Sequence, residues 1–166
     1  MRRHGELCDD EAMSIVLLTT DGSDLATAAM VRGVSLLGRE HNFFAISVVP
    51  AAFKPAAAVG PMDTHPTVID PALEREVAGR GRAESSDELE RLNQVLEVQA
   101  EPLIRTGEPG PAICDAAADL KADVVVVGSH GHGWLQRVLI GSVSNHVLHH
   151  APCPVLVMRL EDTEKD

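Results

Sequence analysis

The stretch that decides the fold is DVVVVGSHGHGWLQRVLIGSVS, residues 123–144. Its four consecutive valines are typical of a strand that is buried on both faces of a sheet. Three glycines within 128–133 then let the backbone turn sharply, and Gly141-Ser142 is placed to begin a helix. Because the free N–H groups of a helix start attract anions, this order of strand, glycine loop and helix start predicts a phosphate site.

The composition indicates an ordinary globular domain. The chain has 166 residues, which is the usual size of one domain with a full hydrophobic core. Only 2% of the residues are aromatic, so Val, Leu, Ile and Ala must build that core. A formal net charge of −11 repels polyanions and argues against nucleic acid as the main partner, so a phosphate ligand must be held locally.

The cysteines and the termini indicate a cytoplasmic protein. Cys8, Cys114 and Cys153 are scattered and lack CxxC spacing, which is typical of reduced thiols. Acidic residues stand where a signal peptide would need an apolar run, and no stretch approaches the ~20 apolar residues of a membrane span. We expect a flexible arm at 1–12, one domain at 13–160 and an acidic tail at 161–166, with no membrane partner.

Apolar runs alternate with helical periodicity along the chain. The runs predict strands at 13–20, 42–49, 123–127 and 153–158, and a weaker strand at 99–106 that belongs at an edge because Pro102 lacks a ladder donor. Helices are expected at 23–37, capped by Ser23, and at 107–120 and 142–150. This alternation predicts an α/β fold with a parallel sheet that helices cover on both faces. We expect the sheet to be open, doubly wound and five-stranded, with the order 3-2-1-4-5.

The buried faces of the first two helices are marked with different clarity. In the helix at 23–37 the apolar residues at roughly helical spacing are Leu25, Ala28, Ala29, Val31, Val34 and Leu37. A further helix is expected at 73–96, where the leucines at 89, 92 and 96 form the stripe. Gly79 and Gly81 weaken its middle, so its first half can be a separate turn.

The segment 51–71 is rich in Pro and Ala and is expected to lack regular structure. It leaves the carboxyl end of the second strand. It can be a lid over a ligand site or only a surface excursion, and both readings stay open.

Polar residues follow the first strand, just as the glycine loop follows the fourth. Thr19, Thr20 and Asp21 stand at this first strand end. Open doubly wound sheets bind ligands at the carboxyl ends of their strands, where the winding reverses. In the order 3-2-1-4-5 the two strand ends are neighbours, so we expect one site between them.

The glycine loop does not fit the two best-known phosphate motifs. A P-loop requires G-x-x-x-x-G-K-[ST], and no Lys precedes Ser142. The dinucleotide fingerprint G-x-G-x-x-G finds Gly131 and Gly133, but Gln136 occupies its third position. The site is therefore expected to hold phosphate without a lysine.

The pattern that remains is Gly128, two residues, Gly131, nine residues and Gly141-Ser142. It resembles the G-2x-G-9x-G-[S/T] nucleotide-binding signature of the universal stress protein family, in its ATP-binding branch. The opening residues 15–23, with Thr-Asp-Gly-Ser, and the closing APCPVLV at 151–157 are also similar to that family. The resemblance covers about 13–159 and is weakest between 51 and 82.

The resemblance implies a sheet of the adenine-nucleotide alpha-hydrolase type, an ATP or AMP ligand and homodimers paired through the last strand, Val155–Met158. Thr19, Thr20 and Asp21 would lie beside ribose and phosphate, and Val48 would contact adenine, near the backbone of Val127 and Gly128. The residues implied as the phosphate cradle are Gly131, Gly141, Ser142, Val143 and Ser144. Because like charges repel, Asp21 suits a ribose hydroxyl, or an Mg²⁺ ion held through the phosphates.

The function that this implies is a regulatory protein that holds ATP, acting on an unknown protein partner. Two alternatives stay open: a slow Mg²⁺-dependent ATP hydrolase in which Asp21 positions water, and a dimeric interaction module that binds no nucleotide. No arginine finger or Walker lysine is visible, so an enzyme is the less favoured reading. A zinc site at His146 and His150 is disfavoured because the pair lacks a third ligand.

Overall fold

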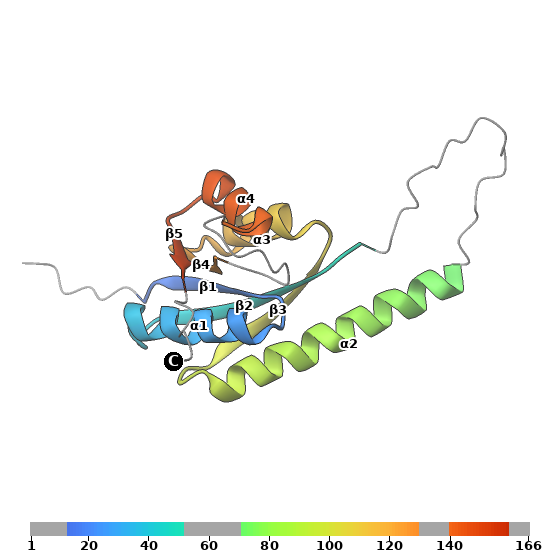
Figure 1. The fold of residues 1–166 in the computed structure, drawn as a ribbon, viewed down its shortest axis with the longest axis horizontal. Helices are drawn as coiled ribbons and strands as arrows, with labels where there is room; N and C mark the ends of the chain where they lie inside the picture. The colour runs from blue at the N-terminus through green and yellow to red at the C-terminus, as the bar shows by residue number, and fades with distance from the viewer. Residues whose placement is uncertain (1–12, 52–70, 130–139, 160–166) are drawn as a thin grey trace, which may run out of the picture.

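The computed structural model describes residues 13–51, 71–129 and 140–159. In this part of the chain the strands are β1 (Ile15–Thr20), β2 (Asn42–Val49), β3 (Ala100–Thr106), β4 (Val124–Gly128) and β5 (Val155–Met158). The helices there are α1 (Asp24–Leu37), α2 (Pro71–Val95), α3 (Pro109–Leu120) and α4 (Ser142–His150). The strands form one parallel sheet of order β3-β2-β1-β4-β5, which confirms the predicted doubly wound fold (Figure 1).

The limits of the description bear on several expectations. The expected arm at 1–12, most of the excursion at 51–71 and the acidic tail at 161–166 lie outside the described residues. None of the helices within the described ranges is both long and apolar enough to cross a membrane.

Several strands begin later than predicted: β1 at Ile15, β4 at Val124 and β5 at Val155. At the start of β4, the side chain and the backbone of Asp123 both bond to Ile15. Its Oδ2 accepts a hydrogen bond from the Ile15 N–H at 2.7 Å, and its own N–H donates to the Ile15 carbonyl at 2.8 Å. Asp123 therefore joins the beginnings of β1 and β4.

At the far edge, Pro102 is exposed in β3, where the sequence predicted an edge strand.

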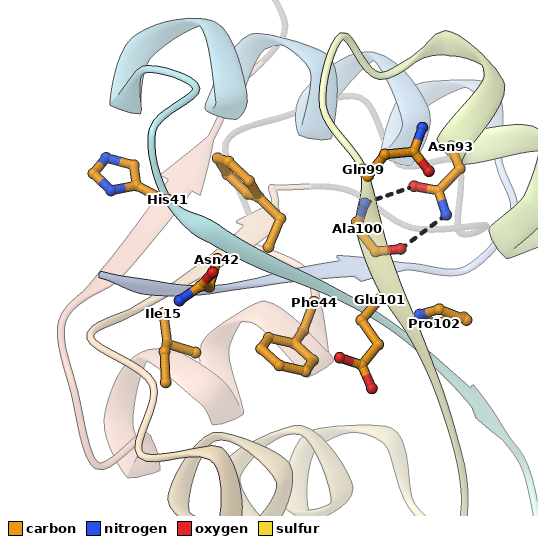
Figure 2. Close-up of a pocket in the computed structure, with 10 residues that line it drawn as sticks. Ile15, His41, Asn42, Phe44, Asn93, Gln99, Ala100, Glu101 and Pro102 are labelled. Carbon is orange, nitrogen blue, oxygen red and sulfur yellow. Dashed lines mark hydrogen bonds between the residues drawn. The ribbon is translucent and has the colours of Figure 1, made fainter. Parts of the chain in front are cut away.

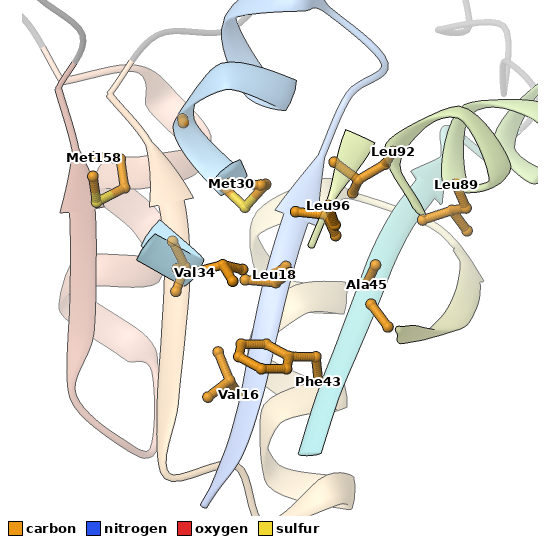
Figure 3. Packing of buried hydrophobic residues seen from close by; sticks show 13 residues of the cluster. Val16, Leu18, Met30, Val34, Phe43, Ala45, Leu89, Leu92, Leu96 and Met158 are labelled. Atoms are coloured by element: carbon orange, nitrogen blue, oxygen red, sulfur yellow. The ribbon is translucent and has the colours of Figure 1, made fainter. Parts of the chain in front are cut away.

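Helices cover both faces of the sheet. α1 and α2 pack on one face, where Figure 3 shows Met30, Leu89 and Leu92 against the strands. α3 and α4 pack on the other face through a second buried cluster that includes Ile113 and Val147. Because both faces are covered, the central strands are apolar without alternation.

α1 begins and ends as predicted but turns a different face to the sheet. The Ser23 hydroxyl accepts a hydrogen bond from the Ala26 N–H at 3.1 Å and so caps the helix. However, Leu25 is 48% exposed and Ala28 is exposed, so the prediction that they face inward was wrong. The residues that α1 buries are Ala26, Ala29, Met30, Gly33 and Val34. Small residues at this contact let the helix lie close to the sheet.

α2 is one continuous helix from Pro71 to Val95, so the separate first turn was wrong. Pro71 suits a first position because its missing N–H would have no helical partner there. Gly81 packs on β2: a Cβ added to it would lie 2.6 Å from the Val49 Cγ1. Around Gly79, by contrast, nothing lies within 4 Å of such a Cβ. The two glycines that weakened the helical pattern thus differ in their surroundings, and in Figure 1 the N-terminal part of α2 extends beyond the sheet.

Gly79→Ala and Gly81→Ala form a matched pair on this helix. We expect Gly79→Ala to raise the free energy of unfolding by about 0.5–1 kcal/mol, since Ala fits an open helix better than Gly. Gly81→Ala should lower it by about 1–3 kcal/mol because the new methyl group overlaps Val49. Urea unfolding of both variants measures the difference. Equal shifts of the same sign would contradict the close packing of α2 on β2.

Candidate functional site

The turn after β1 is closed by its own side chains. The Thr20 hydroxyl accepts a hydrogen bond from the Gly22 N–H at 3.1 Å. Asp21 Oδ1 accepts bonds from the Ser23 N–H at 3.1 Å and from the Ser23 hydroxyl at 2.6 Å. Gly22 has a φ of +77°, a conformation that L side chains rarely adopt. The turn therefore has one well-defined shape at the carboxyl edge of the sheet.

The two described ends of the predicted glycine loop lie together. The Gly141 N–H donates to the Ser129 carbonyl at 3.0 Å, and the Ser144 hydroxyl donates to the Gly128 carbonyl. The Ser129 N–H donates to the Met158 carbonyl at 2.9 Å, which ties this point to the end of β5. The start of α4 is thus fixed at the carboxyl end of β4.

The first turn of α4 presents backbone N–H groups. Gly141 is the N-cap residue, and no side chain caps the helix. The first N–H groups of any helix lack partners within the helix. Ser142 is exposed and Val143 is half-buried, so this end of α4 is accessible. An anion can occupy the place that a capping side chain takes in other helices.

Strand order brings these two features together. β1 and β4 are adjacent, with Leu18 in register with Val126. The turn after Thr20 and the start of α4 therefore leave neighbouring strands at the same edge. Between β1 and β4 the chain also reverses its direction of winding, which is where open α/β sheets bind ligands.

The remaining predicted residues are less open. Val127 is 1% exposed and Thr19 is 8% exposed. The side chain of Val127 lies in the second core cluster, and half-buried Val48 packs against that cluster. A ligand can therefore meet Val127 only through its backbone, as the sequence predicted for that position. Gly131 lies outside the described residues.

Ser144 differs from its expected role. It was named among the residues of the phosphate cradle, but its side chain is 6% exposed and its hydroxyl donates to the Gly128 carbonyl, so only its backbone N–H could serve a ligand. The Ser144 side chain therefore holds α4 to β4. Of the two serine side chains in this turn, only that of Ser142 is exposed.

The thiols near the second core cluster are poor nucleophiles. Burial raises the pKa of the Cys114 thiol, and the neighbouring Asp115 carboxylate raises it further. Burial also raises the pKa of the Cys153 thiol, with Asp123 and Cys114 adding to the effect. Because both pKa values are raised, the two thiols stay protonated at neutral pH. The thiolate, which is the reactive form, is therefore scarce. Both cysteines are free, as predicted.

The two histidines of α4 contact each other, and His146 also packs on α3. The rings of His146 and His150 stack with centroids 4.2 Å apart, and His150 Nδ1 lies 2.8 Å from the His146 carbonyl oxygen. The His146 ring also covers Gly110 of α3, where an added Cβ would lie 2.7 Å from its Cγ. Within the described ranges, no group of three or more His, Cys, Asp or Glu side chains could hold a metal ion.

A hollow of about 540 Å³ lies at the opposite, amino edge of the sheet. Figure 2 shows Ile15, Asn42, Phe44 and Glu101 among the residues that line it. Since Ile15 and Asn42 are the first residues of β1 and β2, this hollow is separate from the strand ends described above.

Ser47 and Ser85 were not among the predicted site residues. They are 2% and 5% exposed, and their hydroxyl oxygens lie 2.9 Å apart. A signal was present in the sequence, because Ser47 is a polar residue within the apolar run 43–49 and stands near the carboxyl end of β2. What Ser47 contacts could not be read from the sequence.

Comparisons with known proteins agree with this architecture. The model of the universal stress protein family matches residues 13–159. Universal stress protein Sll1388 of Synechocystis sp. is 30% identical over 157 residues, which span 87% of this chain and 96% of that protein.

Two solved structures share the fold. Universal stress protein UspA from Lactobacillus plantarum aligns with a TM-score of 0.64 at 26% identity, covering 88% of this chain and 97% of that one. A universal stress protein family protein from Arabidopsis thaliana, solved with AMP bound, aligns with a TM-score of 0.60 at 19% identity, covering 92% and 95%. At that identity the second likeness concerns the fold alone.

The different environments of the two serines can be tested directly. Ser144→Ala should lower the free energy of unfolding by about 1–2 kcal/mol, since it leaves the Gly128 carbonyl without its side-chain donor. Ser142→Ala, at an exposed position, should change it by less than about 0.5 kcal/mol. Chemical denaturation of both variants makes the comparison, and a larger loss for Ser142→Ala would show that the two roles are reversed.

Proposed function

This chain belongs to the universal stress protein family, and from that premise we propose that it is a regulatory protein that binds an adenine nucleotide, ATP or AMP, between the carboxyl ends of β1 and β4. The observation that carries the proposal is the start of α4. It is fixed to β4 by the Gly141 and Ser144 hydrogen bonds and has no side-chain cap.

The phosphates would bind at this helix start. The N–H groups of Ser142, Val143 and Ser144 supply donors, and the α4 dipole adds a favourable field. Gly141, and Gly131 in the loop, would let the phosphates come close to the backbone. Such a cradle acts through fixed dipoles, so it can hold an anion in a molecule whose net charge is −11.

The nucleoside would lie toward β1 and β2. Val48 stands near the carboxyl end of β2, where its half-buried side chain gives adenine an apolar contact, beside the backbone of Val127 and Gly128. Thr19, Thr20 and Asp21 are at the end of β1, within the same edge. An AMP-bound relative of the same fold supports the choice of an adenine nucleotide.

Mg²⁺ would be held through the phosphates and Asp21. The donor set fits only that arrangement, because Asp21 Oδ1 already accepts two hydrogen bonds from Ser23. The described residues also contain no cluster of three or more side chains for a metal ion. When bound, Mg²⁺ would neutralise phosphate charge near the Asp21 carboxylate. Asp21 would then orient the ion or a ribose hydroxyl.

The cytoplasm is the compartment that we propose. Free thiols such as those of Cys114 and Cys153 stay reduced there.

Ser142→Asp separates fold from ligand binding at the proposed cradle. A carboxylate at a helix start should raise the free energy of unfolding by about 0.3–1 kcal/mol. It should also weaken ATP binding by about tenfold or more, because it repels the phosphates. Isothermal titration with ATP and AMP, together with thermal unfolding, measures both effects.

Ser142→Ala is the matched control and should bind ATP nearly as well as the unchanged chain. Mass spectrometry of freshly purified protein provides a second test, by identifying any retained adenine nucleotide. Equal ATP affinity in Ser142→Asp and the unchanged chain would refute the proposed phosphate position. Steady phosphate release that Asp21→Ala abolishes would favour the hydrolase instead.

We also propose that two copies pair through β5. β5 is an edge strand, and an unpaired edge is an association site. On its inner side, Pro154 accepts a hydrogen bond from the Val125 N–H at 3.0 Å, and Met158 accepts one from Ser129. Since backbone groups alternate between the two sides of a strand, those of Val155 and Val157 face the open edge.

Val157→Pro tests this pairing. Proline removes one outward N–H and leaves the ladder to β4 intact, so the variant should sediment as a monomer where the unchanged chain sediments as a dimer. Far-UV circular dichroism checks that the fold is retained. A Val157→Pro variant that is folded and still dimeric would exclude β5 as the interface.

A further inference from the structure

A polar cluster is buried between β2 and α2. The Ser47 hydroxyl oxygen lies 2.9 Å from the Ser85 hydroxyl oxygen and 3.2 Å from Glu88 Oε2. Both serines are buried and Glu88 is half-buried. A carboxylate can only accept hydrogen bonds, so Glu88 provides an acceptor for the Ser47 hydroxyl. Without Glu88, the hydroxyls of Ser47 and Ser85 would compete for hydrogen-bond partners in the core. The cluster therefore links β2 to the middle of α2.

The same carboxyl group also touches the turn after β1. A Cβ added to Gly22 would lie 2.5 Å from both the Glu88 Cδ and the Glu88 Oε1, and 2.8 Å from its Cγ. The Glu88 carboxyl group thus occupies the space that a side chain at position 22 would need. Glycine is required at position 22 for two reasons, the positive φ and the space that the Glu88 carboxyl group takes.

The position of α2 makes this contact possible. Gly81, Ser85 and Glu88 follow one another at spacings of four and three, so they share one face of the helix. At Gly81 that face lies against Val49, the last residue of β2, which is 8% exposed. The helix is therefore close enough to the sheet for Glu88 to reach past Ser47 to the turn.

We propose that Glu88 is a positioning residue for the nucleotide site, acting on Asp21 through the backbone at Gly22. This rests on the proposed function, because the turn that Glu88 contacts carries Thr20 and Asp21. A turn that Glu88 holds in place has fewer conformations to lose when a ligand binds, so Glu88 raises the affinity without contacting the ligand. By linkage, a nucleotide that orders the turn also stabilises the packing of α2, so α2 would report occupancy of the site.

A role for the shape of Glu88 and a role for its charge predict opposite changes in ATP affinity. If Glu88 supports the turn by its shape and as an acceptor, Glu88→Gln keeps most of the effect and Glu88→Ala loses it. If its charge were what mattered, both variants would remove repulsion from the phosphates and bind ATP more tightly. Glu90, which is exposed on the same helix, offers a matched control of equal charge.

The experiment compares Glu88→Ala, Glu88→Gln and Glu90→Ala in the full chain. Hydrogen–deuterium exchange of a peptide that covers residues 21–23 is measured without ligand, and calorimetry measures ATP affinity. We expect Glu88→Ala to speed exchange of this peptide and to raise the Kd by about 2–10-fold, the loss of one hydrogen-bonded support. Glu88→Gln should restore both within about twofold, and Glu90→Ala should match the unchanged chain.

Ser47→Ala is the second variant if Glu88→Ala does not fold, since it removes only the hydroxyl that faces Glu88. It should speed exchange at 21–23 in the same direction. Unchanged exchange at 21–23, or faster exchange spread evenly over the chain, would overturn the positioning role whatever the affinity. If the unchanged chain binds neither ATP nor AMP while exchange follows the expected order, the proposed function fails and the positioning of the turn stands.

Discussion

The rest of this structure depends on the pairing of β1 between β2 and β4. Six residues of β1 are in register with β2, from Ile15 opposite Asn42 to Thr20 opposite Ser47. On its other side β1 pairs with β4, although more than a hundred residues separate the two strands. This one long-range pairing reverses the winding, and it brings the turn after β1 beside the start of α4. The candidate site exists because of it.

α1 and α2 approach the sheet closely at glycine residues. Gly33 of α1 lies against Val126, and Gly81 of α2 lies against Val49. At these two contacts a Cβ would come within 2.8 Å and 2.6 Å of a valine methyl carbon. Because interiors are packed as densely as organic crystals, such contacts set the height of a helix over the sheet. The height of α2, in turn, decides which residues of the turn after β1 it can touch.

Polar groups at the carboxyl edge mostly satisfy one another. Asp21 bonds to Ser23, Ser144 bonds to Gly128, and Ser47 bonds within its cluster. The start of α4 is different, since its cap residue is a glycine and no side chain takes part. α3 also begins at this edge without a side-chain cap, but Pro109 and Pro111 remove N–H groups from its first turn. The uncapped start of α4 is therefore the better suited of the two to holding an anion.

The sequence by itself determined the elements, their order and the strand ends that carry polar residues. Continuous apolar runs marked the strands, Ser23 marked the start of α1, and Pro102 marked the edge strand, because each of these is a local property of the chain. Tertiary structure alone decided which face of α1 is buried, why Gly81 differs from Gly79, and that Ser144 holds α4 to β4. It also decided the contact of Glu88 with Gly22. These outcomes depend on the distance between elements far apart in the sequence, which is fixed only when the helices pack on the sheet.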